Sequence, residues 1–195
     1  NGWMTMLEEG AGEIITAVLG GTKHSIASEE QALLASWAAK TAVMIQYLNP
    51  KPNVPERRRR WLFTHQNPPP DTGVWLARYD GAFVATSLSK ELCIVNNNTE
   101  TPNCPEGHVV FFNHRSLMFV VLSLYLEDVA LRVKFPTRLE NHLFQIWPKT
   151  TQTLTWPKLG LDDSLRTALI SANLGTAFFL HQPPTSPQQS STEKG

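Results

Sequence analysis

The sequence carries little charge, and its charges cancel. It has 17 lysines and arginines and 17 aspartates and glutamates, and charged residues make up only 17% of the 195 residues. A protein whose whole surface attracts nucleic acid normally has a clear excess of basic residues. The zero net charge argues against that class, although it leaves a local basic patch open.

A long hydrophobic run is also missing. The longest apolar stretch, Leu117 to Leu126, is interrupted by Ser123 and is about half of the roughly 20 residues that a membrane-spanning helix needs. The N-terminus has no basic stretch followed by an apolar one, so no secretory signal is visible. We expect a cytoplasmic protein with no membrane partner.

The two cysteines are too few for a disulfide scaffold. Cys93 and Cys104 could join His108 and His114 in one cluster of soft ligands, but their spacing matches no compact zinc motif. A zinc site, a disulfide and two free thiols are the alternatives, and free thiols are the default for a cytosolic chain.

Signatures of catalysis are absent as well. The six histidines are scattered, and no nucleophile elbow or catalytic-cysteine motif accompanies them. Gly20-Gly21 follows a helical pattern rather than a strand, which is the reverse of a nucleotide-binding loop. Asn97-Asn98-Thr99 fits a glycosylation acceptor, but a loop tip is the expectation in a cytosolic protein. We expect no catalytic residue, metal or cofactor in this chain.

The residues that are present favour one folded domain. Apolar residues make up 42% of the chain, which is typical of a globule with its own core. We assign residues 1–181 to one domain. Residues 182–195 are rich in Pro, Gln, Ser and Thr, and we expect them to form a disordered tail.

Apolar spacing predicts helices in the first third of the chain. An amphipathic pattern covers residues 3–19, and a second covers about residues 29–48. Ser28 is the expected cap of the second helix, with Gln31 reaching back in a capping box. A third helix should run from Pro55 to about His65.

After the extended spacer Pro68-Pro69-Pro70, the pattern changes to strands. Residues 74–79 and 82–86 should form a hairpin through Asp80-Gly81. The run 117–124 is either a central strand or a buried helix, and its Phe and Val content favours the strand. Further expected elements are strands at 91–95, 108–113 and 142–147 and a helix at 163–172 capped by Asp162.

The order of these elements predicts an α+β fold. The N-terminal helices should pack on one face of a mostly antiparallel sheet of about four or five strands, with a short helix near the C-terminus. No internal repeat is visible.

The strongest charged feature is the run of four arginines, residues 57–60, after Glu56. On a helix these side chains spread around the circumference, so they cannot all face one partner. Trp61 and His65 follow, and phosphate contact with aromatic support is the functional interpretation. A solvated helix face with ion pairs to Glu56 is the alternative. The candidate nucleic-acid-binding residues are Arg57, Arg58, Arg60 and Arg115.

Several phrases of the sequence stand out: "NGWM" at residues 1–4, "PERRRRWLFTHQNPPP", "VWLARYDG", and "IWP" with a later "WP". Together they resemble a family of uncharacterised bacterial proteins related to HNH endonucleases. The resemblance covers about residues 1–160 in the expected order. Its motifs are structural signatures rather than active-site residues.

The resemblance implies that a small ββα-metal nuclease module with paired zinc knuckles precedes this chain and runs directly into Asn1-Gly2-Trp3-Met4. The zinc and the divalent metal of the family would belong to that upstream module, because the knuckle cysteines and the His motif would lie before Asn1. Without those ligands the chain should not hydrolyse nucleic acid. We expect a non-catalytic C-terminal companion domain.

Three functions stay open for such a domain. The first is a module that positions DNA or RNA through the candidate arginines. The second is a binding module for a small molecule or a protein, built on the sheet and its tryptophans. The third interpretation is a purely structural support for the upstream module. The sequence does not fix the oligomeric state.

Overall fold

The computed structural model describes residues 2–50, 52, 54–92, 107–125, 130–133, 135–148, 152–157, 159–171 and 178–181. Its helices are α1 (Trp3–Leu19), α2 (Ser28–Gln46), α3 (Glu56–His65), α4 (Thr137–Glu140) and α5 (Asp163–Ser171). Its strands are β1 (Ser25–Ile26), β2 (Thr72–Arg78), β3 (Ala85–Leu92), β4 (Gly107–His114), β5 (Leu117–Leu124), β6 (Ala130–Val133), β7 (Phe144–Trp147), β8 (Leu154–Thr155) and β9 (Phe178–His181).

A five-stranded antiparallel sheet forms the centre of the fold, with the strand order β3-β4-β5-β2-β7. Two small antiparallel pairs, β1 with β8 and β6 with β9, lie outside it. All eight residues of β5 are buried, because both of its faces are covered. The strand interpretation of residues 117–124 is therefore confirmed, and so is the α+β class.

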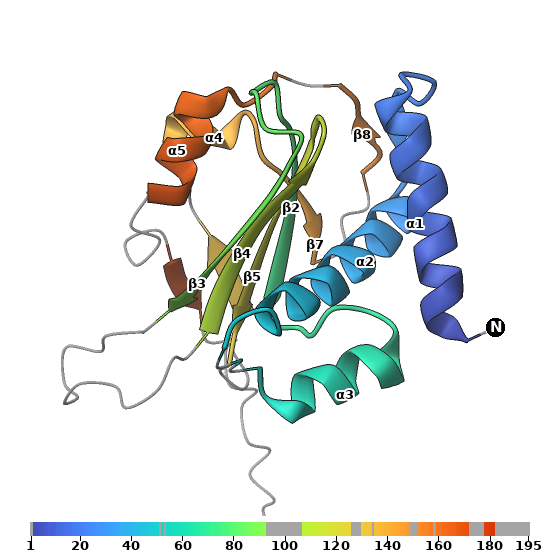
Figure 1. Ribbon diagram of the computed structural model, residues 1–195, viewed down its shortest axis with the longest axis vertical. Helices are drawn as coiled ribbons and strands as arrows, with labels where there is room; N and C mark the ends of the chain where they lie inside the picture. Colours follow the sequence, from blue (N-terminus) through green and yellow to red (C-terminus); the bar gives the residue numbers. More distant parts are fainter. Residues whose placement is uncertain are drawn as a thin grey trace, which may run out of the picture.

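Helices cover both faces of the sheet (Figure 1). Ala35, Ala38 and Ala42 of α2 are fully buried in one core cluster with α1 and the inner residues of β2, β4 and β5. Leu139 of α4 and Leu169 of α5 belong to a second cluster on the opposite face. The expectation that helices pack on one face holds for α1 and α2, whereas the C-terminal helices pack on the other.

The predicted hairpin through Asp80-Gly81 is wrong. Strands β2 and β3 do not pair, because β5 and β7 already occupy the two edges of β2. The Asp80 N–H instead donates to the carbonyl of Leu161 at 2.8 Å, and the chain continues to β3 at the far edge of the sheet. The chain bends at residues 81–82, but the pairing of β2 with β5 and β7 determines where the next strand lies.

The start of α2 differs from the prediction by one residue. The helix begins after Ala27, and the Glu30 carboxylate accepts a hydrogen bond from the Ala27 N–H at 2.8 Å. Gln31, predicted to reach back, is buried and donates to the carbonyls of Ile26 and Gln152 at 2.9 and 2.8 Å. Because Gln31 donates to two backbone carbonyls outside α2, the neighbouring glutamate takes the capping role.

Other expectations on the helices are confirmed. The bounds of α1 match the predicted range, and α3 begins at Glu56, one residue after the predicted start, and ends at His65 as predicted. Asp162 caps α5, since its Oδ1 accepts from the Leu165 N–H at 2.7 Å. None of the described helices is long and apolar enough to cross a membrane. The predictions for Cys93, for Cys104 and for the tail 182–195 lie outside the described residues.

Candidate functional site

Helix α3 distributes its four consecutive arginines between the protein interior and the solvent. At about 100° per residue, Arg58 shares one side of the helix with Leu62, and both are buried. Arg57, Arg59 and Arg60 point away from that side and are exposed. We call these three residues the α3 basic surface.

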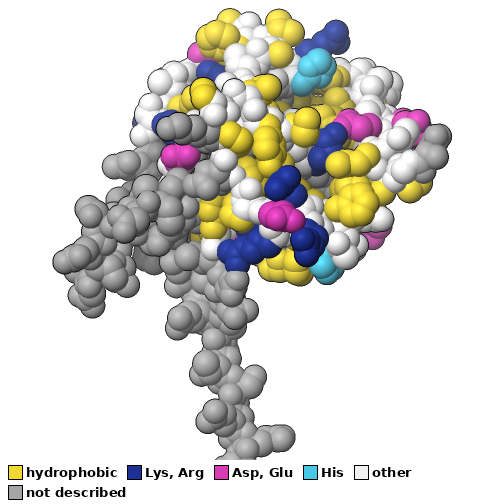
Figure 2. Space-filling view, turned by 60° about the horizontal axis from the view of Figure 1, so that its bottom comes forward, with side chains coloured by type: hydrophobic (Ala, Val, Ile, Leu, Met, Phe, Trp, Pro, Cys, Tyr) yellow, Lys and Arg dark blue, Asp and Glu magenta, His cyan; other side chains and the backbone are white. Residues whose placement is uncertain are grey.

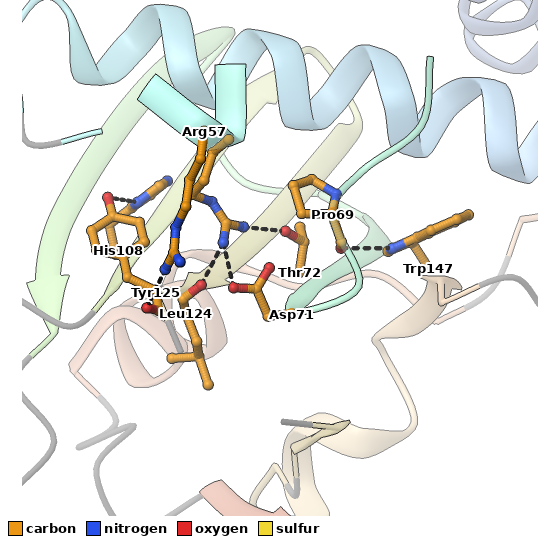
Figure 3. A network of polar contacts seen from close by, with 9 residues as sticks. Arg57, Pro69, Asp71, Thr72, His108, Leu124, Tyr125 and Trp147 are labelled. Carbon is orange, nitrogen blue, oxygen red and sulfur yellow. Dashed lines mark hydrogen bonds and ion pairs between the residues drawn. The ribbon is translucent and has the colours of Figure 1, made fainter. Parts of the chain in front are cut away.

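Arg58 connects α3 to one end of the central sheet, where Asp71, Thr72 and Leu124 lie close together (Figure 3). Its guanidinium donates to the Asp71 carboxylate, to the Thr72 hydroxyl and to the Leu124 carbonyl, each at 2.5 Å. Thr72 is the first residue of β2, Asp71 precedes it, and Leu124 is the last residue of β5, so one side chain joins α3 to two neighbouring strands. Only 4% of Arg58 is exposed. The planar guanidinium suits this task, because it presents several donors in a fixed geometry.

His108 and Tyr125 extend this network on the same face of the sheet. His108 Nδ1 lies 2.6 Å from the Tyr125 hydroxyl, and the Arg58 guanidinium lies 5.5 Å from the centre of the Tyr125 ring. The strand register places His108 beside Ser123 and Ser123 beside Thr72. A row of polar residues therefore crosses three apolar strands directly beneath the start of α3.

Burial keeps His108 and Tyr125 uncharged beside the Arg58–Asp71 ion pair. Burial, with a smaller effect of the Arg58 charge, lowers the pKa of His108 to about 3. Burial likewise raises the pKa of Tyr125 to about 12. His108 Nε2 is buried and has no hydrogen-bond partner among the described residues. At neutral pH both rings are uncharged, so Arg58 and Asp71 form the ion pair of the network.

The exposed arginines make weaker contacts. Arg60 pairs with Glu56 one helical turn earlier at 2.8 Å, and three quarters of the Arg60 side chain is exposed. The Arg59 guanidinium lies 5.7 Å from the centre of the Tyr47 ring. Arg57 donates to the carbonyl of Tyr125 at 2.6 Å. Exposed contacts of this kind contribute little to stability and can be exchanged for a ligand.

Aromatic side chains lie next to these cations. Phe63 is 70% exposed and Tyr47 is 42% exposed. Trp61 and His65 stack with their ring centres 3.8 Å apart. Figure 2 brings the α3 end of the molecule forward and shows Lys and Arg side chains close together among hydrophobic ones, with an acidic side chain between them. The surface is basic and aromatic at the same time.

The structure does not bring Arg115 to this surface. Arg115 is exposed in the turn between β4 and β5, with a φ of 52°. Arg58 contacts Leu124 at the other end of β5, and an eight-residue strand is about 26 Å long. Of the predicted group, Arg57 and Arg60 share the exposed surface, Arg58 lies beneath it and Arg115 lies at the opposite end of the sheet.

Sequence reasoning missed the partners of Arg58 and also Arg59, Tyr47 and Phe63. One signal was available, because His108 and Ser123 interrupt strands that are otherwise apolar. A polar residue inside such a strand needs a buried partner. Nothing in the sequence, however, indicates that Tyr125 would be the partner of His108 or that the second of four arginines would lie in the same network.

Within the described part of the chain, no group of three or more His, Cys, Asp or Glu side chains could hold a metal ion. Searches with protein-family models, among curated proteins and among solved structures found no match for this chain. The functional argument therefore depends on the residues of α3 and their surroundings.

Proposed function

We propose that this chain is a non-catalytic nucleic-acid-binding module that holds a phosphate backbone on the α3 basic surface. The observation that carries the proposal is the difference in burial among the four arginines of α3. One arginine of the run is buried as an anchor, and the three others are exposed on a helix that this anchor holds in place.

Arginine is well suited to phosphate, because its guanidinium can donate two parallel hydrogen bonds to one phosphate group. The existing contacts of the exposed side chains are compatible with this role. The Arg60 ion pair with Glu56 is solvent-exposed on both sides, so a phosphate can replace it at small cost. Because the net charge of the chain is zero, the attraction depends on the exposed arginines of α3 and should weaken as the salt concentration rises.

The role of a companion domain fits this proposal. By the resemblance to HNH-endonuclease-like proteins, an upstream module would supply the zinc site and the catalytic divalent metal, and this chain would hold DNA or RNA near it. The link to that family stays a prediction, because it depends on the sequence phrases alone.

The proposal is tested by charge reversal on α3. Fluorescence anisotropy of a labelled oligonucleotide would be measured for the unchanged chain and for the double variant Arg57→Glu with Arg60→Glu. We expect the variant to bind about tenfold more weakly or worse and to depend less on salt between about 50 and 200 mM. Equal binding by both proteins would exclude the α3 basic surface.

A matched control keeps the same change in net charge. The double variant Arg115→Glu with Arg138→Glu reverses two exposed arginines that lie away from α3. We expect its affinity to stay within about twofold of the unchanged chain, because contacts beyond a Debye length are screened. An equal loss in both double variants would show attraction by overall charge rather than a site on α3.

A protein-interaction module is the second candidate, because the same region exposes apolar side chains. Leu48 is 80% exposed and Met44 is 59% exposed at the end of α2. Exposed apolar groups beside charges are a common feature of protein interfaces. Under this alternative, Leu48→Ala with Met44→Ala should weaken partner binding, measured by calorimetry with the upstream module, while oligonucleotide binding is absent.

A further inference from the structure

The exposed face of α3 alternates arginines with an aromatic ring. Successive residues of a helix are about 100° apart, so Phe63 lies between Arg59 and Arg60 when the helix is viewed along its axis. Phe63 is one turn beyond Arg59 and is 70% exposed. The Tyr47 ring, directly after the end of α2, lies 5.7 Å from the Arg59 guanidinium. We call the group of Tyr47, Arg59, Phe63 and Arg60 the stripe.

Electrostatics alone would make this stripe a weak site for a duplex. Binding to double-stranded nucleic acid depends mainly on the number of phosphates that basic side chains neutralise. The α3 basic surface has three arginines, and Glu56 lies beside one of them. With zero net charge on the chain, no long-range field adds to these few contacts.

Stacking on exposed rings can add binding free energy that the few charges do not supply. Only bases that are not already stacked in a duplex can use it. A base stacked on an aromatic side chain contributes about 1–3 kcal/mol, and every base can stack, because every base has a flat face. In a duplex both faces of each base are covered by neighbouring base pairs. Rings beside arginines therefore favour a single strand, whose backbone follows the cations while its bases contact the rings.

We infer that the nucleic acid bound on α3 is single-stranded, with bases stacked on Phe63 and Tyr47 and phosphates held by Arg59 and Arg60. This inference rests on the proposed nucleic-acid-binding function. It adds the class of ligand and the two rings that select it.

The test compares one labelled sequence of about 12 nucleotides as a single strand and as a duplex, at equal salt. We expect the single strand to bind about tenfold more tightly than the duplex. Phe63→Ala should lower single-strand affinity about tenfold without changing the salt dependence, since it removes a ring and no charge. Phe63→Tyr should keep the affinity, because it retains the ring.

Leu48→Ala serves as the matched control, because it removes an exposed apolar side chain of the same region that has no ring. Its single-strand affinity should stay within about twofold of the unchanged chain. A loss equal to that of Phe63→Ala would indicate general apolar contact and overturn the stacking inference. Equal affinity for both forms of the nucleic acid would also overturn it, yet would leave the proposed function intact. If neither form binds, the proposed function itself fails.

Discussion

Arg58 and Arg59 are neighbours in the sequence and carry the same charge, but their surroundings differ completely. Arg58 is buried against Asp71 and the ends of two strands. Arg59 is exposed, and its guanidinium lies over the Tyr47 ring, 5.7 Å from the ring centre. A single helical step of about 100° separates the two side chains. A run of identical residues on a helix can therefore supply both a buried anchor and exposed binding groups. The position of each residue around the helix axis decides which role it has.

The same difference applies to the free energy of the two cations. A buried guanidinium has lost its water and needs every partner that the protein supplies, so removing one partner costs much. An exposed guanidinium keeps its water and depends little on any one contact. Substitutions should therefore change stability at Arg58 and binding at Arg59.

The largest expected effect is the loss of the anchor. Arg58→Met should lower the free energy of unfolding by about 3–5 kcal/mol, because it leaves the largely buried Asp71 carboxylate without its cation. Urea unfolding at neutral pH measures this change. Arg59→Met, the matched control one residue away, should change stability by about 0.5 kcal/mol or less. Similar losses for both variants would contradict the distinction between the two arginines.

The next effect is a loss of stability in mild acid caused by His108. Its folded-state pKa of about 3 lies below the ordinary value of 6.5. Between these two values the unfolded chain binds a proton that the folded chain does not, so stability falls as the pH falls. Arg58 from α3 opposes the protonation of His108, whereas Glu91 lies opposite His108 on β3.

From pH 7 to pH 5 the expected loss is about 2 kcal/mol, measured by urea unfolding at each pH. His108→Gln has no proton to gain in this range, so its stability should change much less. If the unchanged chain and the variant lose the same amount, His108 does not titrate as a buried neutral group.

A smaller effect is expected from one hydroxyl of the network. Thr72→Val keeps the shape of the side chain but removes the oxygen that accepts a hydrogen bond from Arg58. We expect a loss of about 1–2 kcal/mol in thermal or urea unfolding. Thr64→Val makes the same change at an exposed position of α3 and should be close to neutral. A neutral result for Thr72→Val would mean that Arg58 does not need all of its partners.

The smallest effect on stability is expected at Glu56, where the substitution should instead change oligonucleotide affinity. Glu56→Gln removes the exposed ion pair with Arg60 and should cost less than about 1 kcal/mol. It also removes the acidic group from the α3 basic surface. Oligonucleotide affinity should therefore rise about twofold to threefold, measured by anisotropy. Unchanged or weaker binding would argue against phosphate contact at Arg60.

Much of the fold could be predicted, because it depends on local patterns. The apolar spacing of residues 3–19 and the continuous apolar run 117–124 identified α1 and β5 correctly. The pairing of strands could not be predicted from local patterns. Asp80-Gly81 is a good turn in isolation, but β2 is paired on both edges with strands that come later in the chain. Such long-range pairings leave no trace within a short window of sequence.

The candidate site could be predicted in part. The arginine run and its aromatic neighbours mark α3 as the charged feature of the chain, and helix geometry shows that the four side chains must diverge. Which arginine turns inward depends on Leu62, the residue that shares its side of the helix, and on the sheet end that receives it. Asp71 immediately precedes β2 and Tyr125 immediately follows β5, so their role beside Arg58 became visible only in three dimensions.

The most direct test of the central claim is the salt dependence of oligonucleotide binding in two single variants, Arg59→Gln and Arg60→Gln. Each variant removes one proposed phosphate contact, so the slope of log affinity against log salt concentration should become shallower by about one in each. Slopes equal to that of the unchanged chain would contradict the claim that the exposed arginines of α3 hold a phosphate backbone.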